Sequence, residues 1–265
     1  MDATFFNKIK FQKICFLYLC LIGIVIPISS KVVGQPTESF QQVFEKVDSQ
    51  LKRPNGLYQG TITLLRRNEP TIVQEFELIV RSPQGYLSIR SARRGEEKRI
   101  LWLGKGLEVW LYDVPRRQLI RPEENQRFEP ISAMGFSAVD FFYPWFAENL
   151  TPVNWRSDQL ESNLRIIDAK IPNTEIQLGI GVDLTNKIKR VEIIDNRGIL
   201  LRVIEFSKSK PIVEWKTNRQ FTPNYPTIYE MMDLRSGIVA RFETRSYDPL
   251  FRPDTSLFDP DFLSR

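Results

Sequence analysis

Residues 175–184 read EIQLGIGVDL and alternate strictly between apolar side chains and polar or glycine positions. Successive side chains of a β-strand point to opposite faces of the sheet, so a period of two predicts a strand with one buried face and one solvent-facing face. The buried set is Ile176, Leu178, Ile180, Val182 and Leu184. Such a strand needs neighbouring strands and a second layer over its apolar side, which restricts the chain to a sheet-based fold.

Other stretches rich in β-branched and aromatic residues follow at hairpin spacing, with turn sequences such as TNKI and DNRG between them. Strands are expected at 58–67, 72–82, 85–94, 98–106, 107–114, 117–122, 163–171, 187–195 and 199–209, with a last hairpin over 224–248 turning at 235–237. The chain therefore contains roughly ten strands in meander order, a count that rests on turn spacing.

One amphipathic helix precedes the strands. Its apolar residues recur at helical spacing, Thr37 or Ser39 can cap its start, and residues 54–56 (PNG) end it. The apolar residues are Phe40, Val43, Phe44, Val47 and Leu51.

The stretch 127–150 differs from the rest because it is broken by Pro130 and Gly135 and is the most aromatic part of the chain. We expect it either to fill a large apolar space or to cover one. The predicted fold is mainly β with helices (α+β): a strongly curved antiparallel sheet or incomplete barrel, with helical pieces over its apolar face. The last residues, TSLFDPDFLSR, could dock a terminal helical turn through Phe258, Phe262 and Leu263.

The N-terminus has the three-part layout of a secretory signal peptide: three lysines, an apolar run over 14–29, then small and polar residues. We predict a signal peptide over 1–34 and a single domain over 35–265. The apolar run is shorter than the roughly 20 residues of a transmembrane helix, but an uncleaved membrane anchor remains an alternative. Leu19 before Cys20 disfavours a lipid anchor there.

Removal of the predicted signal peptide would change the net charge of the chain. Residues 1–34 hold four of the 37 basic and one of the 32 acidic residues, so the remaining chain carries 33 basic and 31 acidic side chains. A net charge that small gives no reason to expect a nucleic acid or another polyanion as partner. Both cysteines, Cys15 and Cys20, lie in the predicted signal peptide, so the exported domain must be stable through its core alone.

The chain contains no histidine. Histidine-dependent triads, thiol nucleophiles and Cys/His zinc sites are therefore excluded from the exported domain. Carboxylate pairs such as Asp259 with Asp261, or Glu123 with Glu124, could in principle serve as acid and base. Acids so close in sequence are usually solvated, and we predict no catalytic residue, no metal and no cofactor.

Residues 107–122, LEVWLYDVPRRQLIRP, place Trp110 and Tyr112 beside Arg116, Arg117 and Arg121. Rings and guanidinium groups together can bind single-stranded nucleic acid, which the charge balance disfavours. The stretch can also be an ordinary β-hairpin, or the rim of an apolar cavity that opens to an amphiphile.

The order W-L-Y…R…R followed by M-G…F-S…D-F resembles the outer-membrane lipoprotein-sorting family, relatives of the periplasmic carrier LolA. These positions are Trp110, Leu111, Tyr112, Arg116, Arg117 and Arg121, then Met134, Gly135, Phe136, Ser137, Asp140 and Phe141. In this chain the proline after the tyrosine is delayed to Pro115, and Phe136 replaces the acidic residue that follows the Met-Gly pair.

The resemblance implies an unclosed antiparallel β-barrel, a half-barrel with a helical lid over an apolar concave face. It also implies a periplasmic carrier of acylated lipoproteins or lipids that lacks catalytic residues, served by an inner-membrane donor transporter and an outer-membrane acceptor. An acyl chain of about sixteen carbons gains on the order of 10 kcal/mol on burial, at roughly 0.8 kcal/mol per methylene.

Alternation and the aromatic stretch together select the residues expected to line the acyl cavity: Leu64, Phe76, Leu78, Val109, Leu111, Phe136, Phe141, Phe142, Trp145 and Phe146. The arginines at 116, 117 and 121 are expected to tie the lid or to meet polar head groups. Two alternatives stay open: a structural or interaction module of the envelope with a filled core, and an outer-membrane β-barrel, whose lipid-facing band the many strand arginines would interrupt.

Overall fold

The computed structural model describes residues 38–91, 95–104, 108–131, 134–141, 146–158, 161–207 and 209–265. All of them belong to one unit, Glu38–Arg265. The predicted signal peptide over 1–34 lies outside the described residues and stays a prediction.

The predicted helix is α2, Phe40–Leu51. Ser39 is its N-cap and forms a capping box with Gln42, in which each side chain accepts a hydrogen bond from the other residue's backbone N–H. The apolar stripe of α2 is buried, whereas the opposite face carries Gln41, Glu45 and Lys46 and lies in solvent. The amphipathic pattern therefore predicted both the element and its orientation.

The described residues form one sheet of 15 strands. Their bounds are β1 Gly56–Leu65, β2 Ile72–Arg81, β3 Gln84–Ser91, β4 Gly95–Leu103, β5 Glu108–Asp113, β6 Gln118–Ile120, β7 Thr151–Ser157, β8 Arg165–Lys170, β9 Gln177–Val182, β10 Ile188–Ile194, β11 Leu200–Phe206, β12 Ile212–Glu214, β13 Arg219–Phe221, β14 Ile228–Asp233 and β15 Ile238–Asp248. Along the sheet the order is β6-β5-β4-β3-β2-β1-β15-β14-β11-β10-β9-β8-β7, with β12 and β13 off this path.

The order contains two meanders joined in the middle. Strands β1 to β6 and β7 to β11 each follow chain order, as expected, and β1 pairs with β15 over nine residues to connect the halves. The sequence analysis missed β7 and the short β12–β13 hairpin. β6 and β7 are the two ends of the path, so the sheet is open, as predicted.

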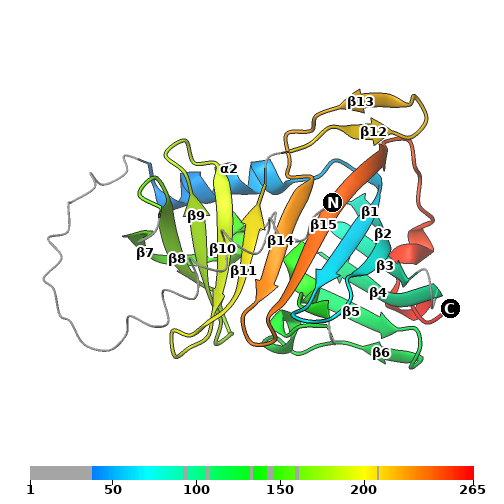
Figure 1. Cartoon of the computed structure of the whole chain (residues 1–265), viewed down its shortest axis with the longest axis horizontal. Helices are drawn as coiled ribbons and strands as arrows, with labels where there is room; N and C mark the ends of the chain where they lie inside the picture. Colours follow the sequence, from blue (N-terminus) through cyan, green and yellow to red (C-terminus); the bar gives the residue numbers. More distant parts are fainter. Residues whose placement is uncertain are drawn as a thin grey trace, which may run out of the picture. The chain divides into compact units, whose positions relative to one another are not determined.

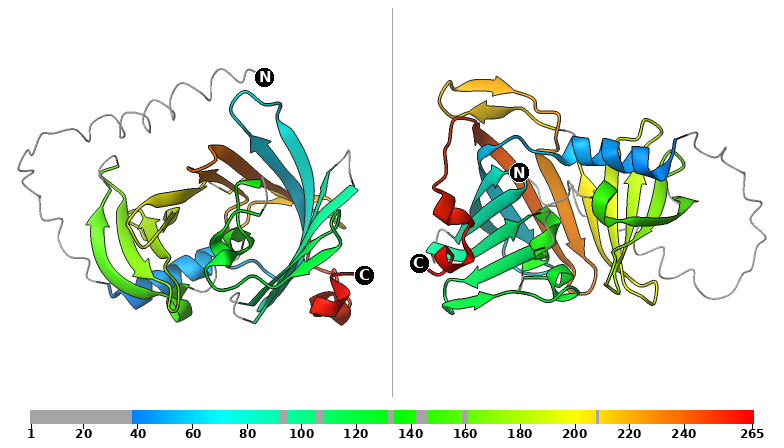
Figure 2. Two further views of the ribbon diagram at one scale, coloured as in Figure 1. Left: turned by 90° about the horizontal axis from the view of Figure 1, so that it is seen from below. Right: turned by 180° about the vertical axis from the view of Figure 1, so that it is seen from behind.

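The sheet curves around α2 and the chain between β6 and β7 (Figure 1, Figure 2). Strand register places apolar residues side by side on the concave face; for example, Leu111 pairs with Ile100, Ile100 with Leu87, and Leu87 with Leu78. Together with the apolar stripe of α2 these side chains form one continuous core. Burial of this face favours the curvature, because the larger core lies on that side.

The convex face has its own smaller core under the C-terminus. The short helices η4, Thr255–Phe258, and η5, Pro260–Phe262, pack Phe258 and Leu263 against Tyr86, Leu101 and Tyr112. The terminal segment was expected to dock in this way.

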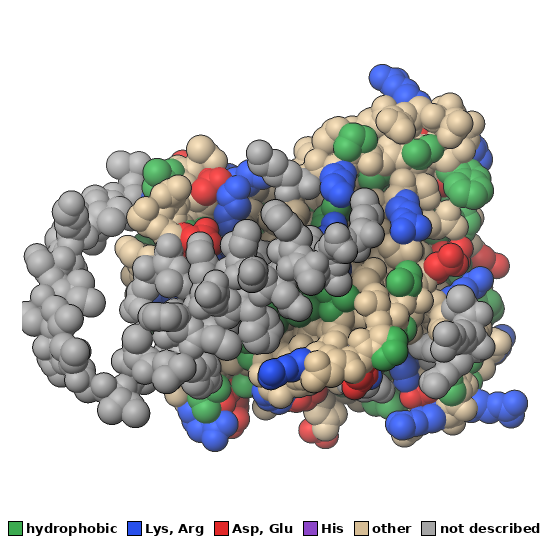
Figure 3. Space-filling view, viewed as in Figure 1, with side chains coloured by type: hydrophobic (Ala, Val, Ile, Leu, Met, Phe, Trp, Pro, Cys, Tyr) green, Lys and Arg blue, Asp and Glu red, His purple; other side chains and the backbone are tan. Residues whose placement is uncertain are grey.

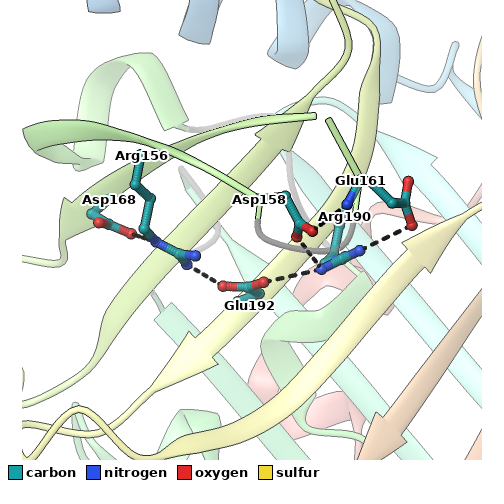
Figure 4. A network of polar contacts seen from close by, with 6 residues as sticks. All are labelled: Arg156, Asp158, Glu161, Asp168, Arg190 and Glu192. Atoms are coloured by element: carbon teal, nitrogen blue, oxygen red, sulfur yellow. Dashed lines mark hydrogen bonds and ion pairs between the residues drawn. The ribbon is translucent and has the colours of Figure 1, made fainter. Parts of the chain in front are cut away.

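The alternation in residues 175–184 correctly placed Leu178, Ile180 and Val182 in the core, but the opposite face of β9 is not simply wet. A Cβ at Gly179 would lie 2.8 Å from Oε2 of Glu192 and 2.9 Å from Nη2 of Arg156, two members of the ion-pair network that Figure 4 shows. In this network Arg156 pairs with Asp168 and Glu192, and Arg190 pairs with Asp158, Glu161 and Glu192. The prediction that Leu184 is buried was wrong: it follows the end of β9 and is 66% exposed.

Candidate functional site

The chain runs from β6, at one edge of the sheet, to β7, at the other, through residues 121–150, which we call the crossing segment. Its described parts contain η1, Gln126–Phe128, η3, Ala138–Phe141, and α3, Phe146–Asn149. Because β6 and β7 lie at opposite ends of the strand order, this segment must span the sheet, and it does so on the concave side (Figure 2). It is the aromatic stretch that the sequence singled out.

Phe136 anchors the middle of the crossing segment in the concave face. Its ring is fully buried and meets Phe242 of β15 edge-on at 5.1 Å, and Phe242 in turn stacks on Tyr229 of β14 at 4.9 Å. The indole Nε1 of Trp102 donates a 2.7 Å hydrogen bond to the carbonyl of Ala138. A buried indole N–H needs such an acceptor, so this bond ties the segment to β4.

Gly135 allows the segment to approach β15 closely. Its φ is +71°, and a Cβ at this position would lie 2.6 Å from Cγ2 of Ile238. Both the left-handed conformation and the lack of space call for glycine here.

A buried ion pair holds the segment further along. Nε of Arg202, on β11, lies 3.1 Å from Oδ2 of Asp140, and the two side chains are 2% and 0% exposed. Arg202 also donates from Nη2 to the carbonyl of Phe128 at 2.7 Å. The carboxylate of Asp140 accepts bonds from the backbone N–H and the hydroxyl of Ser137, which fix its direction.

Helix α2 holds the far end of the crossing segment. The carboxylate of Asp48 accepts the backbone N–H groups of Phe146 at 2.9 Å and Ala147 at 3.0 Å, and the rings of Phe146 and Phe44 meet edge-on. Desolvation raises the pKa of Asp48 to about 6, against the lowering effect of these two hydrogen bonds. The helix itself is fixed to the β7–β10 half, where Phe40 stacks on Trp155.

The structure brings most of the predicted cavity residues together in the concave core. Leu64, Phe76, Leu78, Val109, Phe136 and Phe146 are all 5% exposed or less, and Leu111 packs against them partly buried. In this closed arrangement they contact α2, the crossing segment and one another. A ligand could reach them only if the covering elements moved.

Three predicted lining residues cannot be placed. Phe142 and Trp145 lie outside the described residues, as does the side chain of Phe141. Their role stays a prediction.

The three predicted lid arginines lie beside β5. Arg116 and Arg117 are exposed in the β5–β6 turn, and Nε of Arg116 lies 3.8 Å from Asp113. Arg121 lies 3.4 Å from Glu108 and over the ring of Trp110, 5.4 Å from its centre. The ionic partners of Arg116 and Arg121 within the described ranges, Asp113 and Glu108, both belong to β5, and a role of these arginines toward a lid or a head group stays a prediction.

Strand β5 also explains the mixed character of residues 107–122. Val109 and Leu111 point to the concave core, whereas Trp110 and Tyr112 belong to the convex core beneath the C-terminus. The aromatic rings of β5 therefore do not border the concave face, although the interpretation of this stretch as the rim of an apolar cavity requires that they do.

Sequence reasoning missed Arg202 and Asp48 as anchors and recorded Asp140 only as part of a motif. Arg202 shares a strand face with Ile204, which is fully buried, so a charge at an inward position was the available signal. Its partner could not be identified, because Asp140 lies 62 residues away on an irregular segment.

The surface offers no concentrated charge on the face shown in Figure 3, where basic and acidic side chains are both scattered over the described residues. Within the described ranges, no three His, Cys, Asp or Glu side chains are placed to hold a metal ion. Nor is any helix there long and apolar enough to cross a bilayer.

No protein-family model and no curated protein matches the sequence. Among solved structures, a LolA-superfamily protein from Nitrosomonas europaea is 16% identical and superposes with a TM-score of 0.61, covering 82% of this chain and 96% of the other. A putative outer membrane lipoprotein-sorting protein domain from Vibrio parahaemolyticus is 13% identical with a TM-score of 0.61, covering 85% and 98%. A DUF1329-family protein from Desulfovibrio piger is 13% identical with a TM-score of 0.62, covering 84% and 97%. The large open antiparallel sheet of this chain thus shares the fold of these structures, an open LolA-like half-barrel.

Proposed function

We propose that this chain is a non-enzymatic carrier that binds acyl chains of lipids or lipoproteins on the concave face of its half-barrel. The observation that supports this most is the cover over that face: the crossing segment and α2, not another layer of strands, occupy it. The described parts of the segment are joined to their surroundings by individual polar contacts, at Asn125, Phe128, Glu129, Ala138, Asp140 and residues 146–147.

Binding would exchange one apolar partner for another. An acyl chain would take the place of rings such as Phe136 against the sheet, and its own burial is worth roughly 0.8 kcal/mol per methylene. The polar contacts of the crossing segment would hold the empty carrier closed and break on loading, which makes the cover a two-state element.

Such a carrier would work in the periplasm, receiving its cargo from an inner-membrane donor and passing it to an outer-membrane acceptor. The predicted signal peptide supports this location. The description of the Vibrio neighbour as a putative outer membrane lipoprotein-sorting protein domain supports this direction of transfer.

The test is to purify the full chain from a bacterial envelope and measure its mass under native conditions, before and after extraction with organic solvent. We expect an acyl-containing adduct that extraction removes and that an added fluorescent acyl probe replaces. Loading should also speed hydrogen exchange at the amides of Phe146 and Ala147, since their bonds to Asp48 would open. A folded protein that neither retains nor takes up an acyl chain would contradict the proposal.

A filled-core module of the envelope is the second candidate, favoured by the near-complete burial of Leu64, Phe76 and Phe136. For such a module the acyl probe should not bind, and the amides of the crossing segment should remain protected whatever lipid is added. The variant Leu184→Ala, at an exposed turn position, serves as a control that should affect neither property.

A further inference from the structure

Arg202 is a buried charged side chain on the same face of β11 as Ile204 of the concave core. Across the sheet it pairs with Ile193 of β10 on one side and Asp233 of β14 on the other, and its side chain is 2% exposed. A guanidinium group at such a depth is stable only beside an anion or strong acceptors, because removing an unpaired charge from water is costly.

Both polar partners found for Arg202 within the described residues belong to the crossing segment: the carboxylate of Asp140 and the carbonyl of Phe128. The neighbouring acid of the sheet, Asp233, is already engaged, since it accepts bonds from the backbone N–H of Arg235 and the hydroxyl of Ser236. If the crossing segment moves aside, Arg202 stays in β11 and loses the carboxylate that neutralises it.

We therefore propose that Arg202 makes the carrier selective for amphiphiles with an anionic head group, the acyl chain lying on the concave face and the head replacing Asp140. The inference rests on the proposed carrier function and names the class of cargo. In the empty protein Asp140 acts as a tethered internal ligand for Arg202. A neutral acyl ligand would displace the same segment but leave the guanidinium buried without a counter-charge, so it should bind more weakly.

The test compares ligands that share one acyl chain. Dodecanoate, dodecyl phosphate and the neutral glycerol monoester of dodecanoate compete against a fluorescent acyl probe on the delipidated full chain. We expect each anion to bind at least about tenfold more tightly than the monoester, because only an anionic head group pairs with the buried guanidinium of Arg202. A preference for only one of the anions would identify whether a carboxylate or a phosphate head is recognised.

Two variants locate the effect. Arg202→Gln should bring dodecanoate and the monoester to within about twofold of each other while the monoester still binds. Asp140→Asn should strengthen dodecanoate binding several-fold, because the internal competitor for Arg202 is removed. Arg241→Gln is the matched control: this arginine pairs with Glu230 and alternates with Ala240 and Phe242 of the concave core, so it points to the convex side.

Equal binding of dodecanoate and the monoester by the unmodified protein would overturn the inference and leave the carrier function standing. Binding of neither would refute the carrier function and the inference with it. If Arg202→Gln does not fold, the comparison of Asp140→Asn with the unmodified protein decides: dodecanoate affinity that does not rise contradicts the role assigned to Arg202.

Discussion

The ion pair between Arg202 and Asp140 allows a quantitative prediction about stability. At 3.1 Å the attraction between unit charges is about 5 kcal/mol for an effective dielectric constant of about 20. Breaking a buried pair by removing one partner leaves the other charge without compensation, which costs about 3–5 kcal/mol in measured cases. We expect Asp140→Asn to lower the free energy of unfolding by an amount in that range.

Asparagine is suited to this test because it keeps the shape of aspartate and one oxygen that can accept one of the two bonds from Ser137. The measurement is urea unfolding, monitored by tryptophan fluorescence and circular dichroism. The slope of the unfolding free energy against urea concentration should be the same for each variant, which shows that they unfold in the same transition. Glu124→Gln is the control, because Glu124 is exposed on the same segment, and it should shift the midpoint little.

The double variant Arg202→Met with Asp140→Leu removes both charges. Its loss of stability should be smaller than that of Asp140→Asn, since no buried charge remains and the apolar side chains can pack in the same space. A loss below about 1 kcal/mol for Asp140→Asn, the range of exposed pairs, would show that Arg202 finds other compensation and would refute the description of this pair as the anchor of the crossing segment.

Three further predictions concern the cover and its supports. Phe136→Ala should cost about 3–5 kcal/mol of unfolding free energy, because a fully buried ring leaves a cavity; a loss under about 1 kcal/mol in urea unfolding would mean that the ring is not part of the closed core. The pKa of Asp48 is raised to about 6, so the folded state binds a proton more tightly than the unfolded state, and the free energy of unfolding should increase as the pH falls from about 7 to about 5. Asp48→Asn should lose this part of the pH dependence. The same change in urea midpoint between the two pH values for both proteins would contradict it. Gly135→Ala should destabilise the chain more than Gly198→Ala, because both positions have positive φ but only the first places a Cβ 2.6 Å from Ile238; equal melting temperatures for the two variants would contradict the close approach.

The sequence by itself determined the local structure. Alternation assigned the inward residues of β9, the helical period assigned the buried stripe of α2, and apolar residues at the C-terminus indicated its docking. These predictions hold because they depend on the direction of each side chain relative to its own backbone, which a short stretch of sequence specifies. Alternation and the aromatic stretch also selected six cavity residues that lie together in one buried core.

Only the tertiary structure decided what each inward face meets. The pairing of β1 with β15, the passage of residues 121–150 across the concave face and the meeting of Arg202 with Asp140 join residues distant in sequence. Alternation divides a strand such as β5 into two faces but does not say which core covers each face. The location of Trp110 and Tyr112 beneath the C-terminus therefore became known only from the structure. Long-range register and the position of a charge partner depend on the packing of the whole sheet, and no local pattern encodes them.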